Sequence, residues 1–463
     1  MKKNTFHLVS LGCAKNTVDS NAMAQLLQRE GYVPENDPSN ANVILVNTCG
    51  FIEPAREESY TVLNELAAMK GDDQFLIAAG CLSQRYGQQI IEKVSGIDGI
   101  LGTRRWMDIL QIVQKLREGK DPQPLYHLPE APVVGQSPPG IVGAHVQGGS
   151  AYLKVADGCR RPCAFCAIPT IKGTAVSRSL AEILEDAKIL QSQGVREINL
   201  IAQDTTDYGH DLGQKDGLVN LLKALSSAVP DVDWLRILYA YPGCISDELI
   251  EVMAETDQIL PYIDIPLQHA DPEILKKMRR PANLDWVYQT VEKLRKQMPD
   301  LALRTTFIVG YPGETEQAFQ NLLKFIKEMR FDRVGTFKFS FEPGTYAETM
   351  GDPVPPELKQ ERQEALMLAQ QKISLQINQN LVGETLDVLI EGQGEVEGSG
   401  EVISLGRSYR DAPEIDGMVI VEGALPEGKI IPVRITGAMV YDLTGVPAAD
   451  PELILLSKTG LSS

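Results

Sequence analysis

Three cysteines lie within eight residues of this 463-residue chain, at Cys159, Cys163 and Cys166. An apolar run from Tyr152 to Ala156 precedes them and is typical of a strand. The loop is short and contains Gly and Pro, so it can fold three sulfurs around one metal centre. Structural zinc normally takes four protein ligands, and iron–sulfur clusters are usually held by four Cys thiolates. Three thiols with no fourth ligand nearby therefore indicate a cluster with one open iron, a zinc loop completed from elsewhere, or free buried thiols.

Three further cysteines occupy equivalent places in the first 125 residues, each just after an apolar run that predicts a strand. They are Cys13, Cys49 and Cys81. Helical patterns alternate with these strands, which predicts a parallel sheet with crossover helices. Sites in such sheets form at the carboxyl ends of the strands, beside helix N-termini that favour thiolates. The three thiols can therefore meet at one sheet edge, although their spacing alone fits three unrelated core thiols equally well.

Composition and pattern divide the chain into five segments, with an overall α/β fold class. An N-terminal parallel α/β domain covers residues 1–125, and a linker that contains Pro and Gly follows at 126–148. From 149 to 380, about six strand–helix units predict a partial (β/α) barrel that ends in a connector helix. Short strands with Gly turns at 381–447 predict a small all-β, OB-like barrel. Residues 448–463 form a C-terminal tail.

Polar residues follow two of the predicted central strands at their carboxyl ends. Gln203 and Asp204 follow one strand, and Gln268 follows another. Because barrels of this kind carry their sites at that end, these three residues are candidates for binding a cofactor or a substrate. His269 lies beside them, but a single His is more often packed or solvated than a ligand.

The composition is that of an ordinary soluble protein, with 43% hydrophobic and 23% charged residues. A net charge of −18 argues against broad binding to a phosphate backbone and favours a basic partner. Seven cysteines, mostly in Gly-containing motifs, suit a reducing compartment. There is no adequate apolar leader, and no run approaches a membrane span. We therefore expect a cytoplasmic protein with no membrane partner.

The whole chain resembles the methylthiotransferases, a subfamily of the radical S-adenosylmethionine (SAM) enzymes. The central match is the Cys159, Cys163 and Cys166 spacing, with the aromatic Phe165 before the last cysteine. The C-terminal segment is similar to the family's TRAM domain. The N-terminal matches are Leu11-Gly12-Cys13-Ala14-Lys15-Asn16, Asn47-Thr48-Cys49-Gly50-Phe51 and Gly80-Cys81-Leu82.

The resemblance implies two four-iron, four-sulfur (4Fe–4S) clusters. One would be ligated by the central cysteines, and its open iron would be chelated by the amino and carboxylate groups of SAM. An auxiliary cluster would be ligated by Cys13, Cys49 and Cys81. Cys244, the seventh cysteine, lies outside both sets and is expected to be no ligand. Residues expected to hold SAM or substrate are Phe165, Gln203, Asp204 and Gln268.

Within the family, the chain is more similar to members that modify an aspartate of a small-subunit ribosomal protein than to members that act on transfer RNA. The residues behind this are Cys13-Ala14-Lys15-Asn16 with Val18-Asp19-Ser20, Gly50 to Ala55 and Gly406 to Gly417. Residues 381–447 contain twelve Asp or Glu and four Lys or Arg, a balance of −8, which suits a basic ribosomal protein. The residues expected to bind this partner are Arg407, Tyr409, Asp411, Glu414 and Asp416.

The reaction that the resemblance implies would explain why two clusters are needed. The β-carbon of an aspartate is an unactivated methylene that no side-chain base deprotonates usefully, and cofactors carry such steps. The resemblance implies that SAM is cleaved to a 5′-deoxyadenosyl radical, which removes the β-hydrogen. The auxiliary cluster would then supply a sulfur that a second SAM has methylated. An electron donor and a sulfur source are further expected partners.

Two alternatives remain at this point. A transfer-RNA adenosine methylthiotransferase predicts a basic final barrel with aromatic stacking positions, whereas this segment is acidic; transfer RNA is therefore not the expected partner. An electron-transfer iron–sulfur protein without a substrate would not need six strand–helix units and a recognition barrel.

Overall fold

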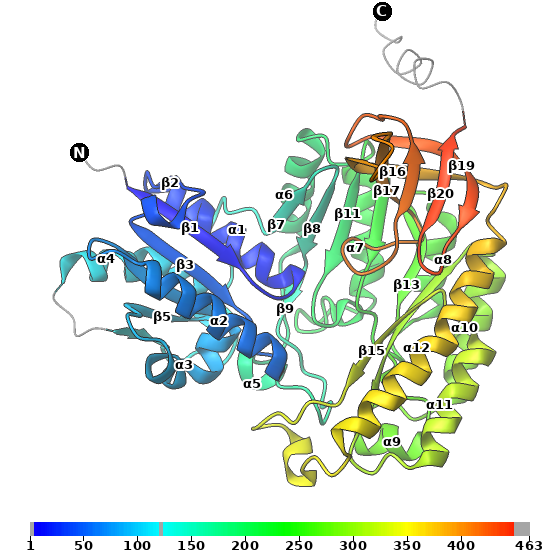
Figure 1. Cartoon of the computed structure of the whole chain (residues 1–463), viewed down its shortest axis with the longest axis horizontal. Coiled ribbons are helices and arrows are strands. Elements are labelled where there is room, and N and C mark those ends of the chain that lie inside the picture. Colours follow the sequence, from blue (N-terminus) through cyan, green and yellow to red (C-terminus); the bar gives the residue numbers. More distant parts are fainter. Residues whose placement is uncertain (1–3, 120–123, 449–463) are drawn as a thin grey trace, which may run out of the picture.

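The structure is a computed structural model that describes residues 4–119 and 124–448 of the chain. An N-terminal sheet, a central sheet and a C-terminal barrel follow one another along it (Figure 1). The N-terminal strands are β1 (Thr5–Ser10), β2 (Val33–Pro34), β3 (Val43–Thr48), β4 (Phe75–Gly80), β5 (Gly99–Gly102) and β6 (Leu125–His127). All are parallel, in the order β2-β1-β3-β4-β5-β6, which confirms the predicted parallel α/β fold.

Helices cover both faces of this sheet, so the N-terminal part has three layers. They are α1 (Ala14–Arg29), α2 (Glu53–Met69), α3 (Cys81–Lys93) and α4 (Ile109–Glu118). Leu27 of α1 and Ile112 of α4 pack on one face, whereas Leu63 of α2 and Ile90 of α3 pack on the other. Because both faces are covered, β3 is buried over its whole length, as is usual for parallel strands.

The central sheet has six parallel strands and one antiparallel edge strand. They are β7 (Ala144–Gln147), β8 (Ser150–Lys154), β11 (Glu197–Ile201), β12 (Trp234–Ile237), β13 (Ile259–Asp264), β14 (Ala302–Val309) and β15 (Arg333–Lys338). Their order is β15-β14-β13-β12-β11-β8-β7, with β7 antiparallel to β8. The sheet is open between β15 and β7, which confirms the predicted partial barrel of about six units. A two-stranded ribbon of β9 (Ala156–Asp157) and β10 (Val176–Ser177) follows β8.

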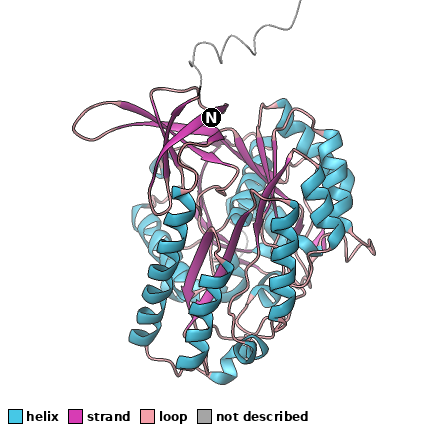
Figure 2. Cartoon of the chain, turned by 90° about the vertical axis from the view of Figure 1, so that its right-hand side faces the viewer, coloured by secondary structure: helices cyan, strands magenta, loops and turns pink. Residues whose placement is uncertain are grey.

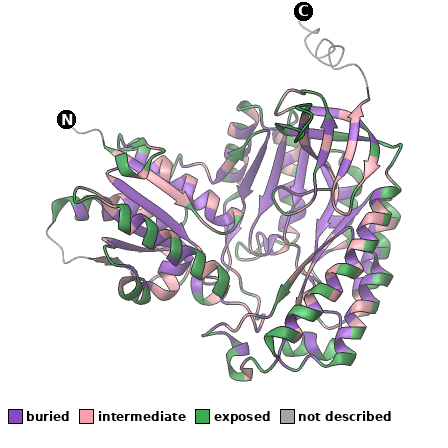
Figure 3. Ribbon diagram, in the orientation of Figure 1, coloured by how far each residue is buried: buried purple, intermediate pink, exposed green. Residues whose placement is uncertain are grey.

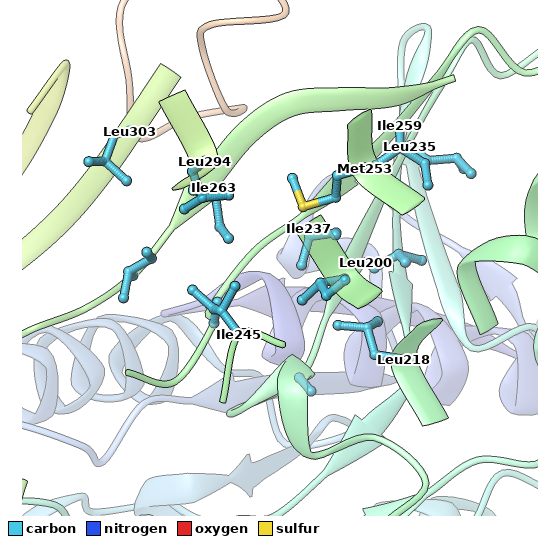
Figure 4. Close-up of a cluster of buried hydrophobic side chains, with 14 of the residues drawn as sticks. Leu200, Leu218, Leu235, Ile237, Ile245, Met253, Ile259, Ile263, Leu294 and Leu303 are labelled. Atoms are coloured by element: carbon cyan, nitrogen blue, oxygen red, sulfur yellow. The ribbon is translucent and has the colours of Figure 1, made fainter. Parts of the chain in front are cut away.

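One face of the central sheet, the outer face, is covered by helices of the same part. They are α6 (Leu180–Ser192), α7 (Gly217–Ala228), α8 (Asp247–Glu255), α10 (Leu284–Gln297) and α11 (Glu316–Met329). Figure 4 shows Leu200 and Ile237 of the strands near Leu218 and Met253 of the helices. Each fully buried Leu or Ile contributes roughly 1.5–3 kcal/mol, so this large cluster fixes the frame of the molecule.

The remaining helices are the long connector and several short segments. The predicted connector is α12 (Pro356–Gln379), which packs along α11 and β15 (Figure 1). The short segments are α5 (Ile168–Lys172), α9 (Pro272–Lys277) and the 3-10 helices Pro38–Asn40, Thr103–Asp108, Thr205–Asp207 and Tyr346–Met350. Among the described residues, no helix is long and apolar enough to cross a membrane.

The C-terminal barrel is closed and has five strands. They are β16 (Thr385–Glu395), β17 (Val402–Ser408), β18 (Val419–Glu422), β19 (Ile430–Ala438) and β20 (Leu443–Pro447), in the order β16-β17-β18-β20-β19. Figure 2 shows these strands gathered at one end of the molecule. The predicted small all-β barrel is confirmed. The sequence pattern did not reveal β20, because its Gly and Pro residues lower its strand propensity.

The opposite, inner face of the central sheet is covered by the other two parts. Tyr152, Trp234 and Tyr262 of this face form one buried cluster with Val18 of α1 and Ala412 of the barrel. Figure 3 shows the strands of both sheets largely buried. The N-terminal helix and the barrel therefore dock on the same face of the central sheet.

The predicted linker at 126–148 differs from the structure at both ends. Its start belongs to β6, which pairs with β5, and its end contains β7, which pairs with β8. Strands of only three or four residues are defined by backbone hydrogen bonds to a neighbouring strand. They are too short to show a side-chain pattern, so the composition of the segment does not predict them. Of the predicted tail at 448–463, all but the first residue lies outside the described residues.

The loop predicted to bind a partner is largely buried between the barrel and the central sheet. Its five predicted residues are Arg407, Tyr409, Asp411, Glu414 and Asp416. Arg407 forms an ion pair with Glu197 at 2.6 Å, Asp411 pairs with Arg333 at 2.6 Å, and Asp416 pairs with Arg304 at 3.2 Å. Tyr409 donates to a backbone carbonyl of the central part, and only Glu414 of the five is exposed. The sequence predicted that these five residues bind the partner; in the structure, Arg407, Asp411 and Asp416 instead form ion pairs with the central sheet.

Removing the Arg407 guanidinium should loosen the barrel from the central sheet. Arg407 is 3% exposed and faces Glu197, which is fully buried. An Arg407→Met variant leaves that carboxylate with one charged partner, Arg236, and a hydrogen bond from Ser150, so we expect a loss of about 3–5 kcal/mol in the free energy of unfolding, measured by denaturant titration. Arg434→Met, at an exposed position of the same barrel, is the matched control and should change it by less than about 0.5 kcal/mol. Equal effects would contradict this role.

Candidate metal and cofactor site

The three N-terminal cysteines lie at the carboxyl ends of three adjacent strands. Cys13 follows β1 and is the N-cap residue of α1, Cys49 directly follows β3, and Cys81 directly follows β4 as the first residue of α3. Since β3 lies between β1 and β4, the sheet order brings the three thiols to one edge. Two of them also stand at helix N-termini, whose partial positive charge favours thiolates.

Glycines beside the cysteines let these loops approach closely. A Cβ at Gly12 would lie 2.8 Å from Cys49 Cβ and 3.0 Å from its Sγ, and Gly12 has a φ of +92°. A Cβ at Gly50 would lie 2.6 Å from the Leu82 Cα. The positive φ and the lack of space both require glycine at position 12.

Asparagine side chains fix the same loops in place. Asn16 Nδ2 donates to the carbonyls of Leu11 at 2.9 Å and Thr48 at 3.1 Å. Asn47 Nδ2 in turn donates to the Asn16 carbonyl at 2.9 Å. These bonds satisfy buried backbone carbonyls where the strands end, and they tie together the loops that carry the thiols.

The central cysteines lie on the loop between β9 and α5, and backbone hydrogen bonds from three segments hold this loop. Cys159 N donates to the Gly173 carbonyl at 3.1 Å, and Ala164 N donates to the Met278 carbonyl at 2.9 Å. The Ala164 carbonyl accepts from Ala347 N at 2.8 Å. The loop is therefore ordered by the protein itself.

One cavity of about 440 Å³ is lined by all six cysteines. The other predicted residues, Phe165, Gln203, Asp204 and Gln268, line the same cavity. Its walls come from the N-terminal part and from the carboxyl ends of the central strands. Every residue predicted to bind metal, SAM or substrate in these two parts therefore borders a single space.

The predicted polar residues differ in how far their hydrogen bonds are satisfied. Gln203 Nε2 donates to Asp157 at 3.0 Å, whereas its buried Oε1 has no partner among the described residues. Asp204 accepts from Arg161 Nε at 2.6 Å. Gln268 has a φ of +75°, which is unusual outside glycine and occurs at functional sites. Gln203 Oε1 is thus an acceptor available to a ligand.

Several further cavity residues were missed from the sequence. Arg161 and Arg280 both stack on Tyr241, each 4.3 Å from the ring centroid, and Arg280 donates to Cys163 Sγ at 3.5 Å. Tyr241 comes shortly after β12, so its position could have revealed it, but Arg280 follows a short helix and gave no signal. The other lining residues are Lys15, Asn16, Phe51, Ile168, Lys172, Tyr239, Ala240, Pro266 and Phe337.

A buried group of four charges joins the N-terminal and central parts beside the cavity. Asp19 of α1 pairs with Lys154 and, at 3.3 Å, with Lys172. Asp157 pairs with the same two lysines at 3.1 and 2.9 Å. All four are nearly inaccessible, and the two signs balance, so breaking one member would leave an uncompensated buried charge.

A second ion network joins the two parts at the loop after β15. Glu342 pairs with Arg56 at 2.5 Å and with Arg85 at 2.7 Å. Arg85 also donates to the Gly50 carbonyl at 3.1 Å, next to Cys49. The two networks together hold the two sets of cysteines in a fixed relation.

The donor set fits iron–sulfur clusters. Each set supplies three thiols, and burial raises the pKa of Cys49 and Cys159 to about 11 and that of Cys166 to about 12. Thiols ligate metal as thiolates, so metal binding must release their protons. In residues 4–119 and 124–448, no three Cys, His, Asp or Glu side chains stand close enough to hold a single metal ion as they are. The fit rests on the shared cavity and on the three thiols of each set.

Cys244 and His269, which were not predicted to be ligands, do not line the cavity. Cys244 accepts from Arg161 Nη2 at 3.2 Å and does not line the cavity. His269 is buried, its Nδ1 accepts from Asp271 N at 2.9 Å, and burial lowers its pKa to about 4. It is therefore a packed neutral His.

Gly12→Ala should disturb the N-terminal thiols specifically. The added Cβ meets Cys49, so we expect a reconstituted variant to bind less iron per chain while its central loop still binds iron. Iron content with a spectroscopic count of clusters measures this. Gly31→Ala is the matched control, because Gly31 also has a positive φ of +80° but nothing lies within 4 Å of its Cβ position. Equal loss in both variants would point to backbone strain and contradict the packing argument.

The chain matches three protein-domain families. Residues 5–102 match the Uncharacterized protein family UPF0004, residues 153–326 the Radical SAM superfamily, and residues 382–447 the TRAM domain. A curated relative from Chloroflexus aurantiacus, "Ribosomal protein uS12 methylthiotransferase RimO", is 46% identical and covers 95% of this chain and 99% of its own. A protein of the same name from Microcystis aeruginosa is 43% identical and covers 96% and 99%.

Solved structures share the fold. The radical SAM methyltransferase TsrM from Kitasatospora setae has a TM-score of 0.56 at 15% identity, covering 85% of this chain and 79% of its own. The match to the Radical SAM superfamily implies one 4Fe–4S cluster and SAM, and the curated relatives make this chain a methylthiotransferase. These curated relatives are more than 40% identical to this protein over nearly its full length and nearly their own. This protein therefore belongs to the ribosomal protein uS12 methylthiotransferase family.

Proposed function

We propose that the protein adds a methylthio group to the β-carbon of an aspartate in ribosomal protein uS12, with SAM and two iron–sulfur clusters. The observation that carries this proposal is the single cavity lined by six thiols from two parts of the chain. Breaking a C–H bond and forming a C–S bond at the same carbon requires both reactive centres to reach that carbon. The assignment of uS12 as the substrate comes from the names of the relatives.

In this proposal each set of thiols holds one cluster. Cys159, Cys163 and Cys166 hold the cluster that works with SAM, and Cys13, Cys49 and Cys81 hold the second one. Three thiols are one fewer than a 4Fe–4S cluster usually takes, so each cluster keeps one position for a ligand that is not protein. When bound, these groups supply hydrogen-atom abstraction from an unactivated carbon and a methylated sulfur. Residues proposed to hold SAM are Phe165, Gln203, Asp204 and Gln268.

The chain's own residues fix the geometry and shield the cavity. The networks centred on Asp19 and Glu342 fasten the N-terminal part to the central part on the cavity's border. Gln203 Oε1 offers an unpaired acceptor, and the rings of Tyr239 and Tyr241 form part of the wall. Excluding water in this way protects a reactive intermediate from side reactions.

The same proposal assigns a task to each segment. Residues 1–125 carry the second cluster, residues 149–380 carry the SAM cluster, and residues 381–447 contact the substrate. The barrel loop is buried, but other acidic residues of the barrel, such as Glu397 and Glu401, are exposed. Their charge suits a basic ribosomal protein and affects mainly the rate of encounter. An electron donor and a sulfur source complete the reaction.

Ribosomal protein uS12 should be the modified molecule. We expect uS12 from cells that express this gene to be heavier by one methylthio group on an aspartate than uS12 from cells that lack it, as measured by mass spectrometry. Purified, reconstituted enzyme should make the same product on uS12 with SAM, a reductant and a sulfur source. Modification of transfer RNA in place of uS12 would contradict the substrate assignment.

The two sets of cysteines should have separable effects. Replacing Cys159, Cys163 and Cys166 by Ala should abolish 5′-deoxyadenosine formation. Replacing Cys13, Cys49 and Cys81 by Ala should leave that formation but abolish the methylthiolated product, as measured by chromatography and mass spectrometry. Cys244→Ser is the control and should keep both iron content and product, because this thiol does not line the cavity. Product from the N-terminal triple variant would contradict the second cluster.

A further inference from the structure

Lys15 spans the cavity between the N-terminal and central parts. It lies in the first turn of α1, two residues after Cys13, and it is 8% exposed. Its Nζ stands 3.4 Å from the centroid of the Tyr239 ring, which follows β12 on the central side. Both side chains line the cavity. The Lys15 ammonium group therefore lies inside the space that the two sets of thiols share.

Lys15 differs from two other cations of this cavity, Lys172 and Arg161, in lacking a carboxylate partner. Lys172 is paired with Asp19 and Asp157, and Arg161 is paired with Asp204. Lys15 forms no ion pair within 4.0 Å among the residues that the structure describes. A buried charge is costly unless it is paired, and stacking on one aromatic ring offsets only part of that cost. The position is therefore suited to an anion from outside the chain.

The fourth cavity cation, Arg280, is engaged elsewhere. Its guanidinium donates to Cys163 Sγ and to the Pro266 carbonyl, so it belongs to the wall around the central cysteines. Lys15 lies instead beside Cys13, at the other set. Its contact with Tyr239 includes a side-chain hydrogen bond, which occupies one of the three donors of the lysine ammonium group and leaves the other donors for a further acceptor.

We infer that Lys15 binds the side-chain carboxylate of the target aspartate. This inference deepens the proposed function and rests on it. The carboxyl carbon of an aspartate is bonded directly to its β-carbon, so a cation that holds the carboxylate also fixes the reacting carbon. Held by Lys15, that carbon lies in the cavity that both thiol sets border. Lys15 is a positioning and specificity residue: it selects aspartate over a neutral side chain of the same shape.

Tyr239 supports this role through its backbone. It has a φ of +63°, a conformation that residues with a side chain rarely adopt, and its neighbour Ala240 is held by a hydrogen bond from its N to the Asp264 carbonyl at 2.8 Å. The strained turn after β12 thereby places the ring beneath the Lys15 ammonium group.

The test compares the binding of two substrates to four forms of the reconstituted enzyme under anaerobic conditions. The substrates are uS12 and uS12 with its target aspartate replaced by Asn. The enzymes are wild type, Lys15→Met, Lys15→Arg and the exposed-lysine control Lys223→Met. We expect wild type and Lys223→Met to prefer the Asp form about ten- to a hundredfold, as one charge-assisted hydrogen bond allows. Lys15→Met should bind both forms equally, and Lys15→Arg should keep part of the preference.

The outcomes separate this inference from the proposed function. If Lys15→Met keeps the wild-type preference, or if wild type shows none, the inference is overturned. If Lys15→Met weakens SAM binding while the preference stays, the ammonium group serves SAM and the inference is again overturned. If wild type neither binds nor modifies uS12, the proposed function fails instead. Should Lys15→Met not fold, Lys15→Gln, which keeps a polar tip of similar length, takes its place with the same expected loss.

Discussion

The inner face of the open central sheet is the constraint on which the rest of the structure depends. Its helices cover the outer face, while the inner face carries buried charges such as Lys154 and Glu197. Buried charges must be paired, and each of these two has a partner in another part of the chain as well as one in the central part. Asp19 of α1 pairs with Lys154, and Arg407 of the barrel pairs with Glu197. Docking α1 on this face also brings Cys13 to the cavity that the central cysteines border.

Much of the fold could be predicted from the sequence because the pattern of each part is local. Apolar runs followed by helical patterns predicted the parallel strands, and short strands with Gly turns predicted the final barrel. Short strands such as β20 escaped because their residues have low strand propensity, and the prediction for the barrel loop failed because it depended on contacts between parts. The acidic residues Asp411 and Asp416 suggested an exposed loop, yet Arg333 and Arg304, far away in the sequence, hold them inside the molecule. The charged residues of a sequence do not show which of them will form ion pairs in the folded protein.

The site shows the same division between local and long-range information. The spacing of the central cysteines indicated a metal-binding loop, whereas Cys13, Cys49 and Cys81 were assigned to a second site only through the family resemblance. Position after a strand also found Gln203 and Gln268, which line the cavity. Lys15 and Arg280 escaped notice as cavity residues, since their importance depends on which other residues they face. Only the docked structure places the Lys15 ammonium group against a ring from another part of the chain.

The central claim is that two sets of three thiols hold two clusters in one cavity. Iron anomalous diffraction from anaerobic crystals of the reconstituted protein tests it most directly. The account predicts two separate groups of iron peaks, one within bonding distance of Cys13, Cys49 and Cys81 and one at Cys159, Cys163 and Cys166, both bordering the cavity of about 440 Å³. A single group of iron peaks at the central cysteines, with the N-terminal thiols free of iron, would contradict it.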